Sequence, residues 1–317
     1  MSTILVAGPA AAQPFLENLV SSIDRDEHDV EFAFGVQRPM DAKSWKETEI
    51  LIAFGVPCDR NDMDAAPRLL AIIVPSLGYE GIDVQHAHRR SIAFANGRVE
   101  ENFESVAEAA ILFILASLYR LRDAETRLRD NVSRTGPPRA RMLKGKTIGI
   151  IGYGNIARAL VRRLVGWDVE VRVSNRSSIA LPEGIRQVAL DDLLVESDIL
   201  VPLVPLTDET SGLLSRERLL SMKEGAILIN LSRGAIIDEA ALTEDSVAGH
   251  LGPLALDVFC EEPLPIDSPL RELPDTILVN HEISHTQENL GALLAMARRN
   301  IEAALENLPM PTAINFN

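Results

Sequence analysis

The sequence predicts an α/β protein made of two parallel-sheet domains. Its 317 residues suit about two domains of ordinary size. Short apolar runs alternate with segments of helical spacing, in two separate series along the chain. Apolar strands separated by helices are typical of parallel sheets that are covered on both faces. The two series therefore indicate two such sheets.

The first series covers roughly the first 90 residues. A helix is expected over Phe15–Ile23, and a long helix over Phe103–Arg129 that is apolar at its start and charged at its end. Residues 131–146 are rich in Pro, Gly and basic residues, which predicts an exposed connector. The predicted strands of this series are Thr3–Ala7, Val30–Phe34, Ile50–Phe54, Leu70–Val74 and Ile92–Phe94.

The second series begins at Thr147 and predicts a doubly wound sheet. Helices are expected at Asn155–Leu164 and Glu239–Leu242, and one amphipathic helix over Gln287–Asn307. Such sheets bind ligands outside the carboxyl ends of their strands. The predicted strands are Thr147–Ile151, Val169–Val173, Ile185–Val188, Ile199–Leu203, Ala226–Asn230, Leu254–Val258 and Thr276–Val279.

Composition and charge exclude several classes of function. The net charge is −15, so binding to nucleic acid or to anionic membranes is not expected. The two cysteines, Cys58 and Cys260, exclude a disulfide scaffold and favour a reducing cytoplasm. No apolar run approaches the roughly 20 residues of a membrane span, and the N-terminus lacks the basic region of a signal peptide.

The segment IGIIGYGNIARAL contains a glycine loop between a strand and a helix. Gly152 would make the tight turn, Gly154 would let the backbone approach a pyrophosphate, and Ala157 would allow close packing. The helix N-terminus at Asn155 and Ile156 would offer N–H groups to the phosphates. A tight turn without a ligand is the alternative interpretation.

The next strand ends without the acidic residue that usually binds the ribose of NAD. Asn175 stands in that region and Arg176 follows it. A neutral residue followed by an arginine favours the 2′-phosphate of NADP, with NAD as the alternative coenzyme. A polar loop with a solvated Arg176 is the other interpretation.

The second half resembles the D-isomer-specific 2-hydroxyacid dehydrogenases. The matching segments are LKGKTIGIIGYGNIA, VPLTDETSGLLSRERLLSMKEGAILINLSRGAIIDEAAL and LALDVFCEEPLPIDSPLRELPDTILVNH, with looser matches in SLGYEGIDV and NFESVAEAA. The pair Asn175-Arg176 is similar to the NADP-using glyoxylate and hydroxypyruvate reductase branch. The resemblance implies a Rossmann nucleotide-binding domain of residues 96–285. It also implies a flavodoxin-like substrate domain of residues 1–95 and 286–317.

The resemblance implies a catalytic trio of Arg233 in INLSRG, Glu262 in DVFCEEP and His281 in LVNH. Arg233 would anchor and polarise a 2-keto acid through its planar fork. His281 would be the acid/base, and Glu262 would orient it and favour its protonated form. The alternatives are a strand-end turn at Arg233, Glu261 in place of Glu262, and a structural His281 with His285 as its rival.

The surroundings of His281 depart from the family pattern. Asn280 replaces the usual proline before the histidine, and Glu282 replaces the usual apolar residue after it. Ser284 and His285 replace small residues. These changes concern the geometry of the loop and the choice of substrate.

The resemblance implies further contacts in both domains. Asp257 would bind the nicotinamide carboxamide, unless it only caps a turn at the end of its strand. The other implied coenzyme contacts are Leu231, Ser232 and Ser284. The implied substrate contacts are Leu77 and Gly78, through backbone N–H groups, and Asn102.

The sequence thus favours an NADP-preferring oxidoreductase of a small 2-keto or 2-hydroxy acid, similar to glyoxylate or hydroxypyruvate. The resemblance implies D stereochemistry and a homodimer formed through the long helix. No metal is expected, because the pair His86 and His88 lacks a third ligand. A nucleotide-sensing corepressor of the same fold is the alternative, and the complete trio favours the enzyme.

Overall fold

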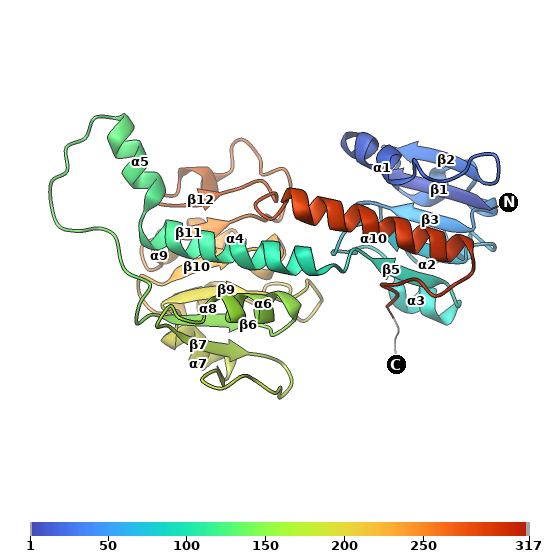
Figure 1. The fold of residues 1–317 in the computed structure, drawn as a ribbon. Helices are drawn as coiled ribbons and strands as arrows, with labels where there is room; N and C mark the ends of the chain where they lie inside the picture. Colours follow the sequence, from blue (N-terminus) through green and yellow to red (C-terminus); the bar gives the residue numbers. More distant parts are fainter. Residues whose placement is uncertain (1, 315–317) are drawn as a thin grey trace. The chain divides into compact units, whose positions relative to one another are not determined.

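The computed structural model describes residues 2–314 of the chain. The fold divides into two compact units (Figure 1). Unit 1 comprises Met1–Asn102 and Gln287–Asn317, and unit 2 comprises Phe103–Thr286. Each unit contains one sheet in which every strand pair is parallel. The predicted fold class of two parallel-sheet α/β domains is therefore confirmed.

The sheet of unit 1 has the order β2-β1-β3-β4-β5, which is the flavodoxin-like order. Helices α1 (Gln13–Leu19) and α10 (Gln287–Leu305) pack on one face, and α2 (Arg60–Asp64) and α3 (Val84–Arg89) on the other. Both faces are covered, which explains why the central strands are apolar throughout. The strands are β1 (Thr3–Gly8), β2 (Asp29–Phe34), β3 (Ile50–Ala53), β4 (Ala71–Val74) and β5 (Ala93–Asn96).

The sheet of unit 2 has the order β12-β11-β10-β9-β6-β7-β8. Counted from β6 this is the Rossmann order extended by one strand, with the order reversing between β6 and β9. The strands are β6 (Thr147–Ile151), β7 (Glu170–Ser174), β8 (Arg186–Gln187), β9 (Ile199–Pro202), β10 (Ile227–Asn230), β11 (Leu254–Leu256) and β12 (Ile277–Leu278).

Helices cover both faces of this second sheet. On one face lie α4 (Glu100–Leu118) and α6 (Asn155–Arg163). On the other lie α7 (Leu190–Glu196), α8 (Arg216–Ser221) and α9 (Asp245–Ala248). All twelve predicted strands occur, with bounds that differ by at most two residues at either end.

The prediction of one long helix over Phe103–Arg129 is wrong. The chain forms α4 and then α5 (Leu121–Arg129), at 55° to each other. Arg120 between them has φ +50°, a left-handed conformation that ends a helix, and its guanidinium pairs with Asp275 at 2.6 Å. The bend therefore depends on a contact with a distant loop.

The helix expected over Glu239–Leu242 is also wrong. Only a 3-10 turn forms there, over Ala241–Thr243, and α9 begins at Asp245. Glu244 between them is extended, with φ −70° and ψ 134°, so the two short pieces do not join into one helix.

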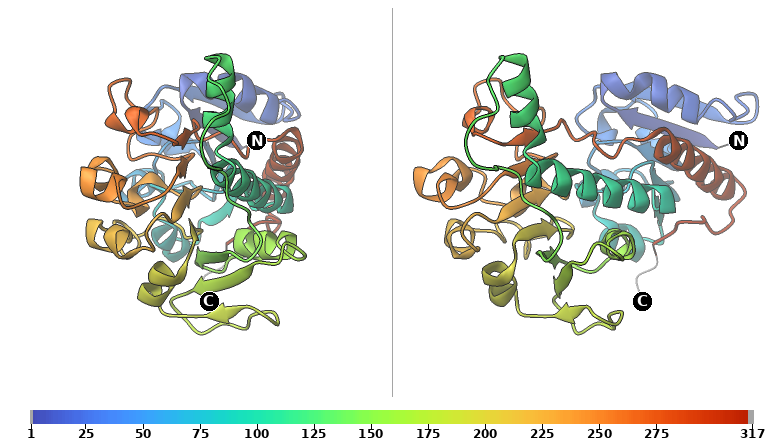
Figure 2. Two further views of the ribbon diagram at one scale, coloured as in Figure 1. Left: turned by 90° about the vertical axis from the view of Figure 1, so that its left-hand side faces the viewer. Right: turned by 60° about the vertical axis from the view of Figure 1, so that its left-hand side comes forward.

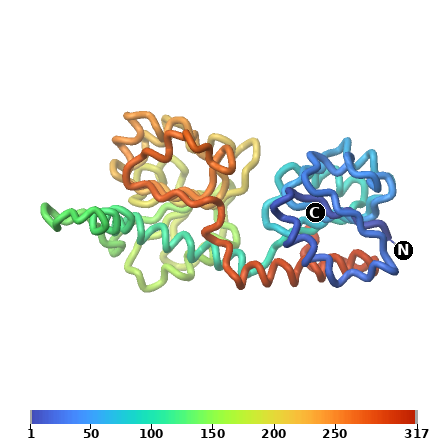
Figure 3. Tube along the Cα trace, turned by 90° about the horizontal axis from the view of Figure 1, so that it is seen from above, coloured from blue at the N-terminus to red at the C-terminus, as the bar shows by residue number. Residues whose placement is uncertain are grey.

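Helix α5 and the following residues 130–142 form an arm that projects from unit 2, as Figures 1, 2 and 3 all show. No residue of α5 is buried. The arm exposes large apolar side chains, among them Leu121, Leu128, Val132 and Met142. Within residues 2–314, no helix taken alone is long and apolar enough to cross a membrane, and only the bent pair α4 and α5 passes that test together.

Candidate active site

The glycine loop follows β6 and leads into α6. Gly152 has φ +89°, and a Cβ there would lie 2.6 Å from the Val204 Cγ1 atom and 2.8 Å from the Leu203 carbonyl oxygen. Only glycine suits this turn. At Gly154, in contrast, a Cβ would meet no atom of the described chain within 4 Å.

The first turn of α6 has N–H groups available to a ligand. Gly154 is its N-cap, and no side chain of residues 2–314 caps the helix. Ala157 is fully buried, so the helix packs closely against the sheet. Open space beside Gly154 and free helix N–H groups at Asn155 and Ile156 fit the pyrophosphate of a dinucleotide.

The loop after β7 contains Asn175 and Arg176. The Asn175 amide donates to the Ser177 carbonyl oxygen at 3.0 Å, and Gln187 donates to the Asn175 carbonyl oxygen at 3.1 Å. The Arg176 side chain is 85% exposed and pairs with Glu209, from the loop after β9. Sequence reasoning missed Glu209, because nothing in its local pattern indicates the pairing.

The turn after β10 positions Arg233. The Asn230 side chain accepts from the Ser232 N–H at 3.1 Å and donates to the Arg233 carbonyl oxygen at 2.9 Å. The Ser232 hydroxyl donates to the Pro202 carbonyl oxygen at 2.7 Å, which ties this turn to β9. Leu231 packs against the core on the α4 side. Asn230 is thus a positioning residue that the sequence analysis did not single out.

The residue after Arg233 brings two turns together. A Cβ on Gly234 would lie 2.0 Å from the Phe259 carbonyl carbon and 2.3 Å from the Cys260 nitrogen. The backbone of the β10 turn therefore contacts the backbone of the turn after β11. This close approach places Arg233 next to the segment that leads to Glu262.

Glu262 and His281 form a hydrogen-bonded pair. The Glu262 Oε2 atom lies 2.8 Å from the His281 Nδ1 atom, and Oε1 accepts from the Phe259 N–H at 3.0 Å. Both side chains are partly exposed, which suits groups that meet a ligand. The carboxylate in this pair belongs to Glu262 rather than Glu261, and the imidazole to His281 rather than His285.

Asp257 holds the loop that contains His281. The residue is 3% exposed, and its Oδ1 accepts from the N–H groups of Glu282 at 3.0 Å and Ile283 at 3.2 Å. The Asp257 carbonyl oxygen accepts from the His281 N–H at 2.7 Å. Burial raises the pKa of the Asp257 carboxyl group.

These bonds support an unusual backbone at His281, whose φ is +53°. Non-glycine residues seldom adopt this left-handed conformation. In this structure the Asp257 side chain therefore caps a turn, as the alternative interpretation of this residue expects. Ser284 lies in the same loop, and its carbonyl oxygen accepts from the Ser105 hydroxyl at 2.6 Å.

The implied substrate contacts lie in unit 1. Asn96, at the end of β5, donates to the Leu77 carbonyl oxygen at 2.7 Å, and the Ser76 hydroxyl donates to the Gly78 carbonyl oxygen at 3.0 Å. These bonds fold the loop after β4. The Asn102 Oδ1 atom is buried and has no hydrogen-bond partner among the described residues.

Comparisons with known proteins identify the family of the chain. Residues 111–282 match the family model of the D-isomer specific 2-hydroxyacid dehydrogenase NAD binding domain. The chain is 35% identical to the glyoxylate/hydroxypyruvate reductase B of Pectobacterium carotovorum subsp. carotovorum over 283 residues, covering 87% of this chain and 88% of the relative. It is also 35% identical to the glyoxylate reductase of Thermofilum pendens, covering 81% of this chain and 78% of that one.

A solved structure shares the fold along almost the whole chain. The TT0316 protein from Thermus thermophilus superposes with a TM-score of 0.84 at 30% identity, covering 99% of this chain and 100% of that one. With a family model that matches more than half of its length, this chain belongs to the D-isomer-specific 2-hydroxyacid dehydrogenases and is a nicotinamide-dependent oxidoreductase.

Proposed function

We propose that this enzyme reduces a small 2-keto acid, of the size of glyoxylate or hydroxypyruvate, to the D-2-hydroxy acid with NADPH in preference to NADH. The observation that carries the proposal is the position of Arg233 and of the Glu262–His281 pair. Both follow strands of the same sheet that bears the glycine loop, at the carboxyl ends where such sheets bind ligands. The bound coenzyme would supply the hydride.

Each member of the trio has a separate task. The Arg233 guanidinium binds the substrate carboxylate and polarises the carbonyl oxygen. His281 donates a proton to that oxygen from Nε2, because Nδ1 faces Glu262. Glu262 positions the imidazole and stabilises its protonated form. Leu77 and Gly78, within residues 1–95 and 286–317, and Asn102 would contact the substrate carboxylate, while residues 96–285 bind the coenzyme.

Coenzyme contacts follow from the same sheet. Gly152, Gly154, Asn155 and Ile156 would hold the pyrophosphate, and Leu231, Ser232 and Ser284 would border the nicotinamide. Asp257 would bind the carboxamide while it keeps its hydrogen bonds to the His281 loop. Reduction of glyoxylate or hydroxypyruvate, followed through the absorbance of the reduced coenzyme, tests the function. Failure with both acids, alongside intact coenzyme binding, would favour the corepressor alternative.

Replacing Arg233 with lysine is expected to weaken keto-acid turnover. Lysine keeps the charge but lacks the planar fork, and charge-assisted hydrogen bonds contribute roughly 1.5–3 kcal/mol, so kcat/KM should fall on the order of 10–100-fold. Steady-state kinetics measure the change. The same substitution at Arg271, which donates to the carbonyl oxygens of Pro265 and Leu264, is the control. Equal kinetics in both variants would remove Arg233 from the site.

The double change Asn175→Asp with Arg176→Ala is expected to reverse the coenzyme preference from NADPH to NADH. Arg176 offers the 2′-phosphate a charge-assisted pair that is worth roughly 10–100-fold, and an aspartate would repel the phosphate. The measurement is the ratio of kcat/KM for the two coenzymes. Preference of the natural enzyme for NADH would mean that Arg176 is only a solvated surface residue.

Glu209 sharpens this test, because it competes with the phosphate for Arg176. An exposed ion pair is weak, so Glu209→Gln should raise the preference for NADPH only about two- to fivefold. The gain should vanish in a protein that already carries Arg176→Ala. A gain that persists there would show that Glu209 acts without Arg176.

The arm formed by α5 and residues 130–142 is proposed to build a homodimer. Its exposed apolar side chains, with Leu128 80% exposed, are a surface that a second copy of the chain would cover. Leu128→Glu is expected to give monomers in light scattering, whereas Arg129→Glu, which keeps the apolar surface, should leave dimers. Monomers for the natural chain would contradict the proposal.

We further propose a cytoplasmic location, which suits two unpaired cysteines.

A further inference from the structure

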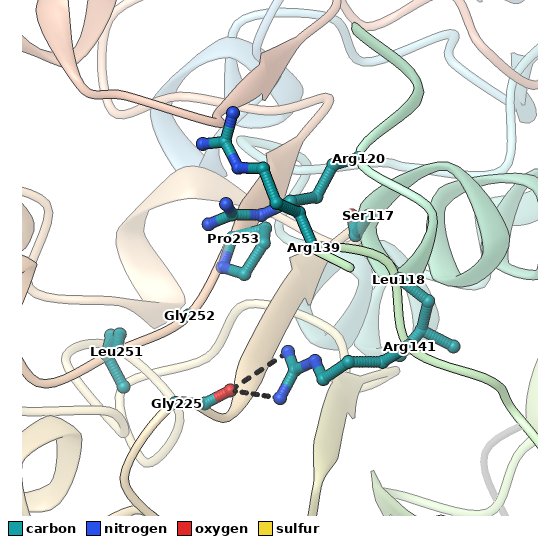
Figure 4. A pocket seen from close by; sticks show the side chains of 9 residues that line it. All are labelled: Ser117, Leu118, Arg120, Arg139, Arg141, Gly225, Leu251, Gly252 and Pro253. Atoms are coloured by element: carbon teal, nitrogen blue, oxygen red, sulfur yellow. Dashed lines mark hydrogen bonds between the residues drawn. The ribbon is translucent and has the colours of Figure 1, made fainter. Parts of the chain in front are cut away.

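We propose that unit 2 carries a binding site for a small oxyanion, a carboxylate or phosphate group, at the base of the arm. A cavity of about 390 Å³ lies there, within the usual range for ligand pockets. Figure 4 shows Arg120 and Arg139 with their guanidinium groups close together near Pro253, and Arg141 extending toward Gly225. These residues come from the α4–α5 junction, the arm and two strand ends.

Positive charge is concentrated in this cavity although the whole chain is strongly acidic. Three arginines line it, and none of its lining residues is acidic. Asp275 pairs with Arg120 at 2.6 Å and Asp123 pairs with Arg139 at 2.8 Å, each from outside the cavity. These pairs use only part of the five N–H donors of each guanidinium.

The third arginine is the least compensated of the three. Arg141 donates from Nη1 and Nη2 to the Gly225 carbonyl oxygen, at 3.1 and 3.2 Å. A single carbonyl oxygen neutralises none of its charge. The cavity therefore holds more positive charge than its neighbouring carboxylates balance, and an oxyanion would supply the difference.

A buried hydroxyl group in the same cavity points independently to a ligand. Ser117 is 2% exposed, and its Oγ has no hydrogen-bond partner among the described residues. Ser117 lines the cavity together with the arginines. A buried polar atom without a partner destabilises a fold, and rotation of the Ser117 side chain toward the arginines would let an oxyanion oxygen satisfy it.

The cavity is separate from the catalytic residues. Gly225 precedes β10 and Pro253 precedes β11, at the amino ends of these strands. Arg233 and Asp257 follow the carboxyl ends of the same strands. An anion in the cavity would therefore not compete with the substrate. It would instead connect the part of the arm that follows α5, through Arg139 and Arg141, to the sheet.

Thermal unfolding of the full chain with saturating NADP⁺ tests the site. One series of measurements uses inorganic phosphate and a second series uses malonate. Sodium chloride at equal ionic strength corrects for general salt effects. A specific anion should raise Tm on the order of 5 °C at about 100 times its Kd. The anion that gives the larger rise in Tm shows whether the site prefers a phosphate or a carboxylate group.

Two variants and one control variant locate the effect. Arg139→Gln with Arg141→Gln should abolish the rise, whereas Arg127→Gln with Arg129→Gln, which removes the same charge from the same arm, should keep it. Ser117→Ala should leave Tm without anion equal or higher, since it removes an unpartnered hydroxyl, and should reduce the rise with anion. This second variant keeps the test valid if the double variant folds poorly.

The proposal fails if neither anion raises Tm above the chloride control. It also fails if the rise survives in both the Arg139/Arg141 double variant and the Ser117 variant, because the anion then binds elsewhere. None of these measurements depends on turnover, so their outcome is independent of the proposed keto-acid reduction.

Discussion

Replacing His281 with asparagine is expected to lower kcat/KM for keto-acid reduction on the order of 10²–10⁴-fold, the usual contribution of a general acid. Asparagine tolerates the left-handed backbone that His281 adopts, so the loop should keep its shape while the titrating group is lost. Steady-state kinetics with glyoxylate or hydroxypyruvate measure the loss, and an unchanged Tm serves as the folding control. His285→Asn is the matched variant and should stay within a few-fold of the natural enzyme. The opposite ranking would make His285 the acid.

Glu262 gives the same experiment a pH-dependent readout. With His281 as the proposed acid, reduction uses the imidazolium and should decline as the pH rises, while oxidation uses the neutral imidazole and should show the opposite slope. Glu262→Gln replaces the carboxylate that lies 2.8 Å from the imidazole with a neutral amide, and the expected result is a reductive rate that declines at lower pH. Glu261→Gln should leave the profile in place. A profile that moves only in the Glu261 variant would reassign the partner.

Replacing Gly234 with alanine is expected to lower the free energy of unfolding of unit 2 by roughly 3 kcal/mol or more. The new Cβ would lie 2.0 Å from the Phe259 carbonyl carbon, and backbone atoms on both sides leave no flexible side chain to yield. For a unit of this size Tm should fall by about 6–12 °C. Catalysis should fall too, because the clash moves Arg233 away from the Glu262 turn. Calorimetry and steady-state kinetics provide the two readouts.

Gly154→Ala is the matched control for this prediction. It lies in the same unit, has φ −84°, and its Cβ would meet no atom of the described chain within 4 Å. Without coenzyme its Tm should therefore stay close to that of the natural chain. Its affinity for coenzyme should fall, because the Cβ occupies the side from which a pyrophosphate approaches. An equal loss of Tm in both variants would contradict the steric explanation.

The strands were predictable because parallel strands buried on both faces are short apolar runs. The run Thr147–Ile151 is a strand with those same bounds. The break at Arg120 was not predictable, because the surrounding residues favour a helix and the pairing with Asp275 is a tertiary contact. Local sequence patterns contain no information about such long-range pairs.

The candidate site likewise contains features that the sequence predicts and features that depend on tertiary contacts. Motifs with a local mechanism, such as the turn at Gly152, indicate their own conformation. The pairing of Arg176 with Glu209 joins two loops that lie 33 positions apart, and neither loop has a pattern that indicates it. The support that Asn230 gives to the Arg233 turn likewise depends on hydrogen bonds that appear only in the folded chain.

The direct backbone contact at Gly234 bears on how this enzyme can be redesigned. It makes the Arg233 turn and the turn before Glu262 one mechanical block, with no side chain between them to vary. The loop at Asn175 follows β7, three strand positions from β10, or about 14 Å. Selection in the laboratory can therefore exchange the coenzyme preference at that loop while the reacting geometry stays fixed. Substitutions in the block itself should be tolerated only when they preserve its backbone.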